Sequence, residues 1–516
     1  MSVDEGALRA GAPVQAKPPW LVLGVIGTAQ LMVVLDLTVM NIALPSAQRA
    51  LHFSVADRQW VVTAYTLAFG SLLLLGGGLA DLLGRKTAFL VGLVGFAGVS
   101  TVGGASVNFA MLVTARACQG AFAALLVPSA LSLLTTTFTD PKDRGKAFGV
   151  FGAIATAGGA LGLLLGGLLT EYLSWRFTLY VNLIFAAVAL VGAVRLLHRQ
   201  VSPLKPRVDA PGAVLASGGL FCLVYGFSNA ATHSWHTAST WAFLVAGIVL
   251  LVAFAFWITR SAHPLLPPRV VLDRNRSGAY LSMIFGSLCL FATFLFLTYY
   301  MQRTLGYSPV VTGLAFLPIS VCLAGAANLS TIVLMPRVGP KPVVTTGLVV
   351  AAGAMVWLAQ LGAHSGYAAG LLGPIVVVGI GIGMVIAPSI STGTFGVAPQ
   401  DAGVASATVT VGQQLGASIG TSLLNTIFAS AVASYLVAHA SAAGLVGRSS
   451  LGALAQAHGY DTAFWWASAI VAAGAVVAGL LLRPGPLAGR VPSGVRPAPA
   501  TDFPVPKSSG VAVDPV

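Results

Sequence analysis

Charged residues are scarce in this chain. Only 8% of the 516 residues are Asp, Glu, Lys or Arg, whereas 56% are hydrophobic. A soluble protein of this length carries many more charged groups on its surface. The composition therefore excludes an ordinary soluble protein and indicates a chain whose solvent is the lipid bilayer.

Metal-ligand and disulfide patterns are also lacking in the sequence. The four cysteines stand singly in apolar runs, and the eight histidines show no i, i+4 pair. No paired carboxylates or nucleophile motif supports an enzyme. The net charge of +13 is spread over short segments between apolar runs, whereas a nucleic-acid site needs it gathered on one face. We therefore expect no enzymatic activity, no metal or other cofactor and no nucleic-acid partner.

The chain consists instead of a long series of apolar runs. Each is about 20 residues long, which is the length of a helix that crosses the hydrocarbon core of a membrane. We predict fourteen membrane-spanning helices, and hence an all-α polytopic membrane protein. The predicted spans are residues 20–44, 58–80, 87–106, 110–136, 146–169, 177–197, 210–229, 239–259, 278–301, 311–335, 341–361, 367–389, 403–437 and 463–482.

The basic residues predict the orientation of these spans. The terminal segments, one helix end and the loops after every second span hold 21 of the 27 Lys and Arg residues. Five basic residues, including Arg58 at the start of the second predicted span, fall on the opposite side. Because Lys and Arg favour cytoplasmic loops, we place the N-terminal segment 1–19 and the tail 483–516 in the cytoplasm. The tail is rich in Pro, Gly and Ser, which predicts disorder.

A sequence repeat predicts two related halves. The stretch from Leu79 to Val94 matches the stretch from Leu334 to Val349 at a constant offset of 255 residues, with the same Gly-x-Lys turn in both. We therefore predict a six-helix bundle over residues 20–197, a linker with two extra helices over 198–260, and a second six-helix bundle over 261–482. Two related halves with a site at the membrane midplane are typical of secondary transporters.

Asp36 is the only acid well inside a predicted span. A charged Asp at the centre of a spanning helix costs about 2.5–3.5 kcal/mol on insertion scales, so it should face the interior of the bundle. Arg116 is the matching cation, and Gln119 lies on the same face of its helix. We predict that Asp36 and Arg116 couple transport to protons, with Asp36 as the group that binds the proton. A static ion pair between helices is the alternative.

Two further segments predict conformational and packing roles. The loop GGLADLLGRKT contains Gly78, Asp81, Gly84, Arg85 and Lys86, whose charges can pair with helix ends and hold one conformation. Arg85 and Lys86 also contribute to the predicted membrane orientation, as basic residues of a cytoplasmic loop. In AGGALGLLLGG the residues Gly158, Gly162 and Gly166 recur at four-residue spacing, with Gly167 beside them, which is typical of close helix contacts.

Several polar and aromatic residues are candidates for lining a substrate cavity. They lie in or beside spans 1, 2, 4 and 13, and aromatic residues in such places often belong to the interfacial belt instead. The candidates are Asn41, Trp60, Tyr65, Gln119 and Gln414.

These motifs together resemble the fourteen-helix drug:proton antiporters of the major facilitator superfamily. LDLTVMNIALP carries Asp36, GGLADLLGRKT is similar to the signature loop of the superfamily, and ARACQGAFAA carries Arg116. SWRFTLYVN, with Asn182 at its end, is also similar to the family. The fifth-helix motif departs from the pattern, because Gly159 and Leu163 stand where prolines are usual.

The resemblance implies a function for the whole chain. We expect a monomer in the bacterial cytoplasmic membrane that exports hydrophobic or cationic drugs, or an endogenous antibiotic, by alternating access. The proton motive force, and no cofactor, would drive it. A proton-coupled uptake symporter of the same architecture and an exporter of lipids are the alternatives, since lipids and hydrophobic drugs need similar cavities.

Overall fold

The structure is a computed structural model of an almost entirely helical chain. It describes residues 18–54, 57–138, 141–197, 209–233, 235, 237–261, 264–362, 365–397, 402–439 and 448–486. The predicted N-terminal segment 1–19 and the tail 483–516 lie almost wholly outside these residues.

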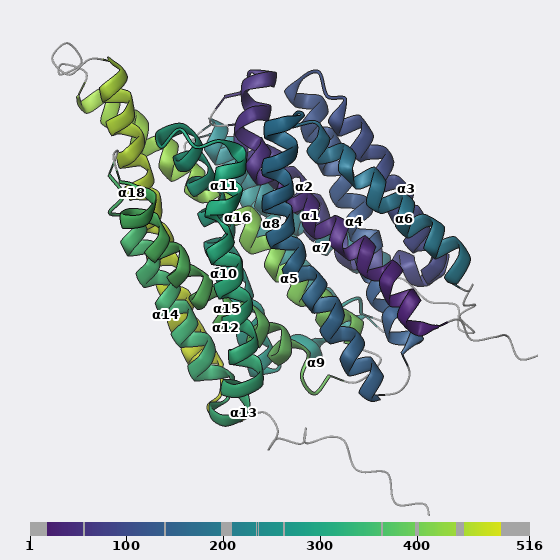
Figure 1. Ribbon diagram of the computed structural model, residues 1–516. Helices are drawn as coiled ribbons and strands as arrows, with labels where there is room; N and C mark the ends of the chain where they lie inside the picture. The colour runs from purple at the N-terminus through teal and green to yellow at the C-terminus, as the bar shows by residue number, and fades with distance from the viewer. Residues whose placement is uncertain are drawn as a thin grey trace, which may run out of the picture.

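Every predicted span corresponds to one helix or to several consecutive helical segments of the structure (Figure 1). The N-terminal half contains α1 (Pro19–Leu51), α2 (Arg58–Leu83), α3 (Arg85–Gly104), α4 (Phe109–Thr137), α5 (Pro141–Tyr172) and α6 (Phe177–Leu196). An inserted pair follows, α7 (Ala210–His233) and α8 (Ala238–Arg260). The C-terminal half contains α9 (Pro268–Val271), α10 (Arg274–Tyr299), η1 (Tyr300–Thr304), α11 (Pro309–Ala315), α12 (Leu317–Asn328), η2 (Leu329–Leu334), α13 (Met335–Val338), α14 (Pro340–Leu358), η3 (Tyr367–Leu371), α15 (Leu372–Thr394), α16 (Ala402–Ala438) and α18 (Arg448–Leu481).

Length and composition identify most of these helices as membrane spans. Within the described residues, twelve helical segments are long and apolar enough to cross a membrane. The helices α2 and α5 are not among the twelve, although they occupy the second and fifth predicted spans. The number fourteen therefore stays a prediction, whereas the polytopic helical fold is confirmed.

Two boundaries differ from the predicted ones. Helix α1 continues through Pro45 to Leu51, and in the same stretch Gln302 donates a hydrogen bond to the carbonyl of Ile42 at 3.1 Å. Helix α18 begins at Arg448 rather than near residue 463, so Asp461 also lies inside a helical span. The prediction that Asp36 is the only such acid is therefore wrong.

The predicted repeat is visible in the backbone at its two glycines. Gly84 separates α2 from α3 with a φ of 82°, and Gly339 separates α13 from α14 with a φ of 83°. Residues other than glycine rarely adopt this φ, which is why both turns carry glycine. Lys86 and Lys341 then stand in the first turn of the following helix in both halves.

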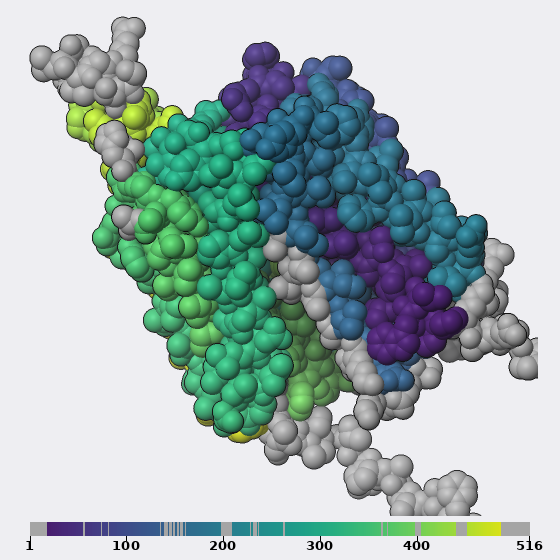
Figure 2. Space-filling view, viewed as in Figure 1, coloured from purple at the N-terminus to yellow at the C-terminus, as the bar shows by residue number. Residues whose placement is uncertain are grey.

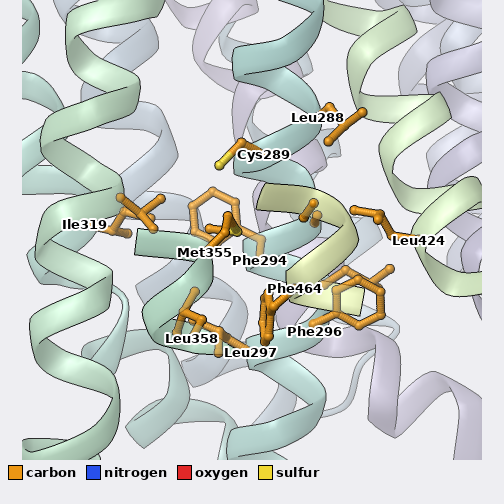
Figure 3. Packing of buried hydrophobic residues seen from close by; sticks show 14 of the residues in the cluster. Leu288, Cys289, Phe294, Phe296, Leu297, Ile319, Met355, Leu358, Leu424 and Phe464 are labelled. Carbon is orange, nitrogen blue, oxygen red and sulfur yellow. The ribbon is translucent and has the colours of Figure 1, made fainter. Parts of the chain in front are cut away.

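The two halves pack against each other through two apolar clusters. Figures 1 and 2 show the N-terminal half, purple to blue, beside the C-terminal half, teal to yellow-green. One apolar cluster joins Met40, Ile42 and Val61 of the first half to residues of α10, α14 and α18. Figure 3 shows the second-half part of this cluster, with Phe296 and Leu297 beside Phe464. We call the end that contains Arg58 the outer end, because its loops are predicted to face away from the cytoplasm.

The inserted pair lies beside this boundary between the halves. Helix α7 contacts both α2 and α16, while α8 packs mainly on α7. Most of α8 is exposed in the structure, and its exposed side chains are large and apolar, as expected for a surface that faces lipid. These exposed residues include Trp241, Val245, Ile248, Val249, Val252 and Phe256.

Candidate functional site

A buried ion pair forms the centre of the N-terminal half. Asp36 of α1 and Arg116 of α4 are 2% and 0% exposed, respectively. The Arg116 Nη1 atom donates to the Asp36 Oδ2 atom at 2.5 Å. The structure thus brings together the two residues that the sequence assigned to proton coupling.

Two amides hold the other oxygen of the Asp36 carboxylate. Asn182 of α6 donates to the Asp36 Oδ1 atom at 2.7 Å, and Gln119 of α4 donates to it at 3.2 Å. Ser100 of α3 accepts a hydrogen bond from Gln119 at 2.7 Å and contacts Asn182 at 3.4 Å. The carboxylate therefore accepts hydrogen bonds from three side chains, and charge-assisted bonds of this kind are stronger than those between neutral groups.

Asn182 and Ser100 were not predicted as site residues. Asn182 could have been found from the sequence, because an amide inside an apolar span requires a hydrogen-bond partner in the bundle. Ser100 could not have been found in this way, because serine is common in spanning helices and usually bonds to its own backbone. Ser100 does this as well, donating to the Phe96 carbonyl at 2.7 Å.

Arg116 also links the ion pair to α2. Its Nε atom donates to the carbonyl of Val61 at 3.1 Å, and its guanidinium lies 4.5 Å from the centre of the Tyr65 ring. Its Nη1 atom donates to Gln119 at 2.9 Å as well. The Nη2 atom is buried and has no partner among the described residues. One guanidinium therefore connects α1, α2 and α4.

The chemistry available to this cluster follows from its burial. Removing one partner of a buried ion pair leaves an uncompensated charge and costs about 3–5 kcal/mol. A proton on Asp36, or a cation that competes for it, therefore leaves Arg116 without its counter-charge and favours a different arrangement of α1, α2 and α4. A residue that responds in this way is suited to coupling ion binding to conformation.

The loop predicted as a latch is held by its lysine. Lys86 donates to the carbonyl of Leu197 at 2.5 Å and to that of Val194 at 3.3 Å, at the C-terminal end of α6. A cation at this end of a helix complements the helix dipole. Gly78, Gly84 and Arg85 are half-buried. The side chain of Asp81 lies outside the described residues, so its role in a latch stays a prediction.

The glycines of α5 lie where two helices approach closely. A Cβ atom at Gly158, Gly162 or Gly166 would come within about 3 Å of atoms of α1, the closest being the Thr38 Oγ1 atom at 1.9 Å from Gly162. Gly167 faces the other half instead, and its Cβ would lie 2.7 Å from the Pro309 carbonyl oxygen. Three of the four glycines thus serve α1 packing, and the fourth serves contact between the halves.

The predicted cavity residues do not lie together. Tyr65 and Gln119 belong to the Asp36 cluster described above. Asn41 donates to the Leu37 carbonyl of its own helix at 3.1 Å, and the ring of Trp60 lies 5.5 Å from that of Tyr225 on α7. Gln414 lies against Gly70 at the boundary between the halves. A cavity of about 300 Å³ at the outer end has a different lining, which is Pro45, Arg49, Gln302, Arg303, Gly306, Tyr307, Ser308 and Pro309.

Arg58 is a second buried arginine, and its burial was not predicted, although the second predicted span begins at this residue. It is the first residue of α2 and is 2% exposed. Its Nε atom donates to the Asn425 Oδ1 atom of α16 at 2.9 Å. Asp57 and a short loop precede it in the sequence, and α2 turns its first residue toward the C-terminal half.

Small hydroxyl groups continue this contact along α2. Thr66 lies 2.5 Å from Ser418, and Thr63 lies 3.3 Å from Ser422, each measured between hydroxyl oxygens. Asn425 also donates to Gln59 at 2.6 Å. Hydrogen bonds between the two halves come from this part of α2, from the end of α1 and from the end of α5. The halves are thus closed at the outer end.

Curated relatives of this chain are resistance and export proteins. The chain is 45% identical to the puromycin resistance protein pur8 of Streptomyces alboniger, over 90% of this chain and 91% of that protein. It is 38% identical to the cephamycin export protein CmcT of Amycolatopsis lactamdurans, over 83% of this chain and 88% of that protein.

A solved structure and a family model agree with this relation. The fold is similar to that of a bacterial homolog of the human lysosomal transporter Spinster, with a TM-score of 0.62 and 15% identity, over 90% of this chain and 98% of that chain. The family model of the Major Facilitator Superfamily matches residues 26–232 and 210–421. This chain is therefore a member of the Major Facilitator Superfamily.

Proposed function

We propose that this protein exports a small hydrophobic or cationic antibiotic across the bacterial cytoplasmic membrane in exchange for protons. The observation that carries the proposal is the buried Asp36–Arg116 pair, because its charge balance changes when a proton or a cation binds. The names of the relatives, which concern resistance to puromycin and export of cephamycin, support an antibiotic as the substrate class.

The proposed cycle alternates between two charge states of Asp36. In the unprotonated state Arg116, Asn182 and Gln119 hold the carboxylate, as in the structure. A proton from outside neutralises Asp36 and weakens its bond to Arg116. Because Arg116 is also bonded to the Val61 carbonyl, this change reaches α2 and its contacts with α16. Loss of the proton to the cytoplasm restores the pair.

This cycle requires the predicted architecture. We propose that residues 20–197 and 261–482 act as two bundles that move about the membrane midplane, with residues 198–260 as an insertion. Both termini lie in the cytoplasm in this proposal, and one chain is sufficient for transport. The proton motive force takes the place of a cofactor.

The decisive experiment replaces Asp36 in membrane vesicles. Asp36→Asn keeps the size and polarity of the side chain but binds no proton, so we expect proton-driven drug efflux to fall to the level of empty vesicles. The measurement is accumulation of a lipophilic fluorescent cation in inverted vesicles under an imposed proton gradient.

A matched variant controls for loss of a carboxylate as such. Asp273 accepts a hydrogen bond from the backbone N–H of Arg276 as the N-cap of α10, and Asn caps helices equally well. Asp273→Asn should therefore transport normally. Normal proton-driven efflux in Asp36→Asn, with normal insertion, would disprove the proton-coupling role. Drug uptake instead of efflux by the unmodified protein would favour a symporter.

A further inference from the structure

Arg58 carries a buried charge without a neutralising partner. No carboxylate among the described residues forms an ion pair with it, and its Nη2 atom is buried without a hydrogen-bond partner. A buried charge is normally paired, because its loss of hydration is costly. Arg116, by contrast, has Asp36. Something other than an anion must therefore stabilise Arg58.

Aromatic rings of the other half surround the Arg58 guanidinium. Its central carbon lies 4.1 Å from the centre of the Tyr299 ring, 5.0 Å from that of Phe428 and 5.9 Å from that of Phe296. We call these three rings the aromatic cage. All three side chains are buried. A cation within about 6 Å of a ring face is attracted by the ring quadrupole, and most strongly when both are desolvated.

Two of the three rings of the aromatic cage are held by contacts within the C-terminal half. Phe296 and Phe428 each contact the ring of Tyr460 on α18, at 6.3 and 4.9 Å between ring centres. Phe296 also packs on Phe464, as Figure 3 shows. These contacts lie within α10, α16 and α18 of the C-terminal half. Phe296 and Phe428 are therefore held by their own half, whereas the Tyr299 hydroxyl donates to Gln48 of α1 at 3.1 Å.

Separation of the halves at the outer end would uncover the aromatic cage. The cation comes from α2 and the rings come from α10 and α16, so the boundary between the halves runs between them. Clusters of aromatic ring faces bind quaternary ammonium and other organic cations. In the closed state Arg58 occupies the place that such a ligand would take.

We propose that the aromatic cage is a binding site for the cationic group of a substrate on its way out, and that Arg58 displaces this group when the outer end closes. The proposal deepens the function above and rests on it. Arg58 acts as a tethered competitor, so its local concentration near the cage is high whenever the halves approach. Closure and release of a cation are then the same event.

Binding of tetraphenylphosphonium to the purified full-length protein tests this proposal. The measurements are made in an Asp36→Asn background, so that the Asp36 carboxylate does not bind the probe. Adding Arg58→Gln, which can still donate to Asn425, should tighten binding about tenfold. This is the factor that about 1.4 kcal/mol produces, within the range of a desolvated cation–π contact. Arg58→Lys restores a tethered cation and should bind the probe nearly as weakly as the parent.

Cage variants distinguish this site from other probe sites. Phe428→Leu added to Arg58→Gln should abolish the gain. Phe294→Leu is the matched control, because Phe294 packs on Phe316 and is not part of the cage. Equal affinity with and without Arg58→Gln, or a gain that survives Phe428→Leu, would overturn the proposal. Either result leaves the efflux measurements on Asp36 unaffected, so failure of the cage is distinct from failure of the export function.

Discussion

Two buried arginines in this molecule are stabilised in different ways, and one helix connects them. Arg116 is paired with the Asp36 carboxylate, whereas Arg58 lies among aromatic rings of the other half. Arg116 bonds to the carbonyl of Val61, three residues after Arg58 on α2. In the proposed cycle, a change in the charge of Asp36 reaches the part of α2 that carries Arg58, without any contact between the two sites.

The amide of Asn182 provides a prediction at this scale. Asn182→Leu removes a hydrogen bond to a buried carboxylate, and such bonds contribute about 1.5–3 kcal/mol. We therefore expect the rate of proton-driven efflux to fall at least about tenfold, while expression and insertion are kept. Asn229→Leu is the control, because Asn229 is also buried but donates to Ser239 and Thr240 in the inserted pair. Equal rates in both variants would contradict the assignment of Asn182 to the coupling site.

The sequence predicts charged pairs inside a membrane better than it predicts their surroundings. Asp36 and Arg116 were recognisable because each costs free energy in lipid unless it has a partner. The burial of Arg58 was not recognisable, since an arginine beside a predicted loop is expected to be hydrated. Its burial depends on three rings from α10 and α16, more than 230 positions away in the chain. No local pattern contains that information.

At the scale of helices, glycine decides how closely α5 approaches α1. Gly162→Ala would place a Cβ atom 1.9 Å from the Thr38 hydroxyl oxygen, so α5 or Thr38 must move. Thr38 already donates to the Val34 carbonyl, which restricts its hydroxyl. We expect the free energy of unfolding to decrease by about 1–3 kcal/mol, which is the usual cost of overpacking. The measurement is the unfolding temperature of the purified protein in detergent.

Gly159 provides the matched control for Gly162. It stands three residues earlier on the same helix, and a Cβ atom there meets nothing within 4 Å. Gly159→Ala should be neutral or slightly stabilising, because alanine favours the helix by about 1 kcal/mol over glycine. Equal unfolding temperatures for both alanine variants would show that the four-residue glycine spacing does not determine the contact with α1.

Apolar length predicted where the helices lie, but not how they are interrupted. The tenth predicted span is divided into α11, α12, η2 and α13, with Pro309, Pro318 and Pro336 near the starts of three of these pieces. Pro45, in contrast, lies within α1 without ending it. A proline in a spanning helix is tolerated where neighbours bond to the freed backbone groups. Tertiary contacts therefore decide between these outcomes.

At the scale of the whole molecule, the structure captures one of the states that transport requires. The halves are closed at the outer end by the α2–α16 and α5–α11 contacts. The sequence could predict two halves from its repeat, but not which end is closed. The same residues must form and break these contacts in turn, so both states are encoded and their free energies differ by little.

The contact between α5 and α11 gives a direct test of this closed end. A Cβ atom at Gly313 would lie 2.5 Å from the carbonyl oxygen of Leu163, a backbone atom that cannot rotate away. Gly313→Val should therefore destabilise the outward-closed state by about 1–3 kcal/mol and shift the equilibrium toward outer opening by about 5- to 150-fold. The measurement is labelling of a single cysteine. For this purpose, Thr63→Cys is introduced into a protein whose four native cysteines are replaced by alanine. Thr63 is 0% exposed at the boundary between the halves.

Labelling of this cysteine by an impermeant maleimide, added outside intact cells, should be slow in the parent and at least about fivefold faster with Gly313→Val. Gly353→Val is the control: a Cβ atom there meets nothing within 4 Å on α14, so labelling should stay slow. Equal labelling rates in the two valine variants would mean that the α5–α11 contact does not hold the outer end closed. Fast labelling in Gly313→Val together with reduced efflux would place this contact among those that must re-form in every transport cycle.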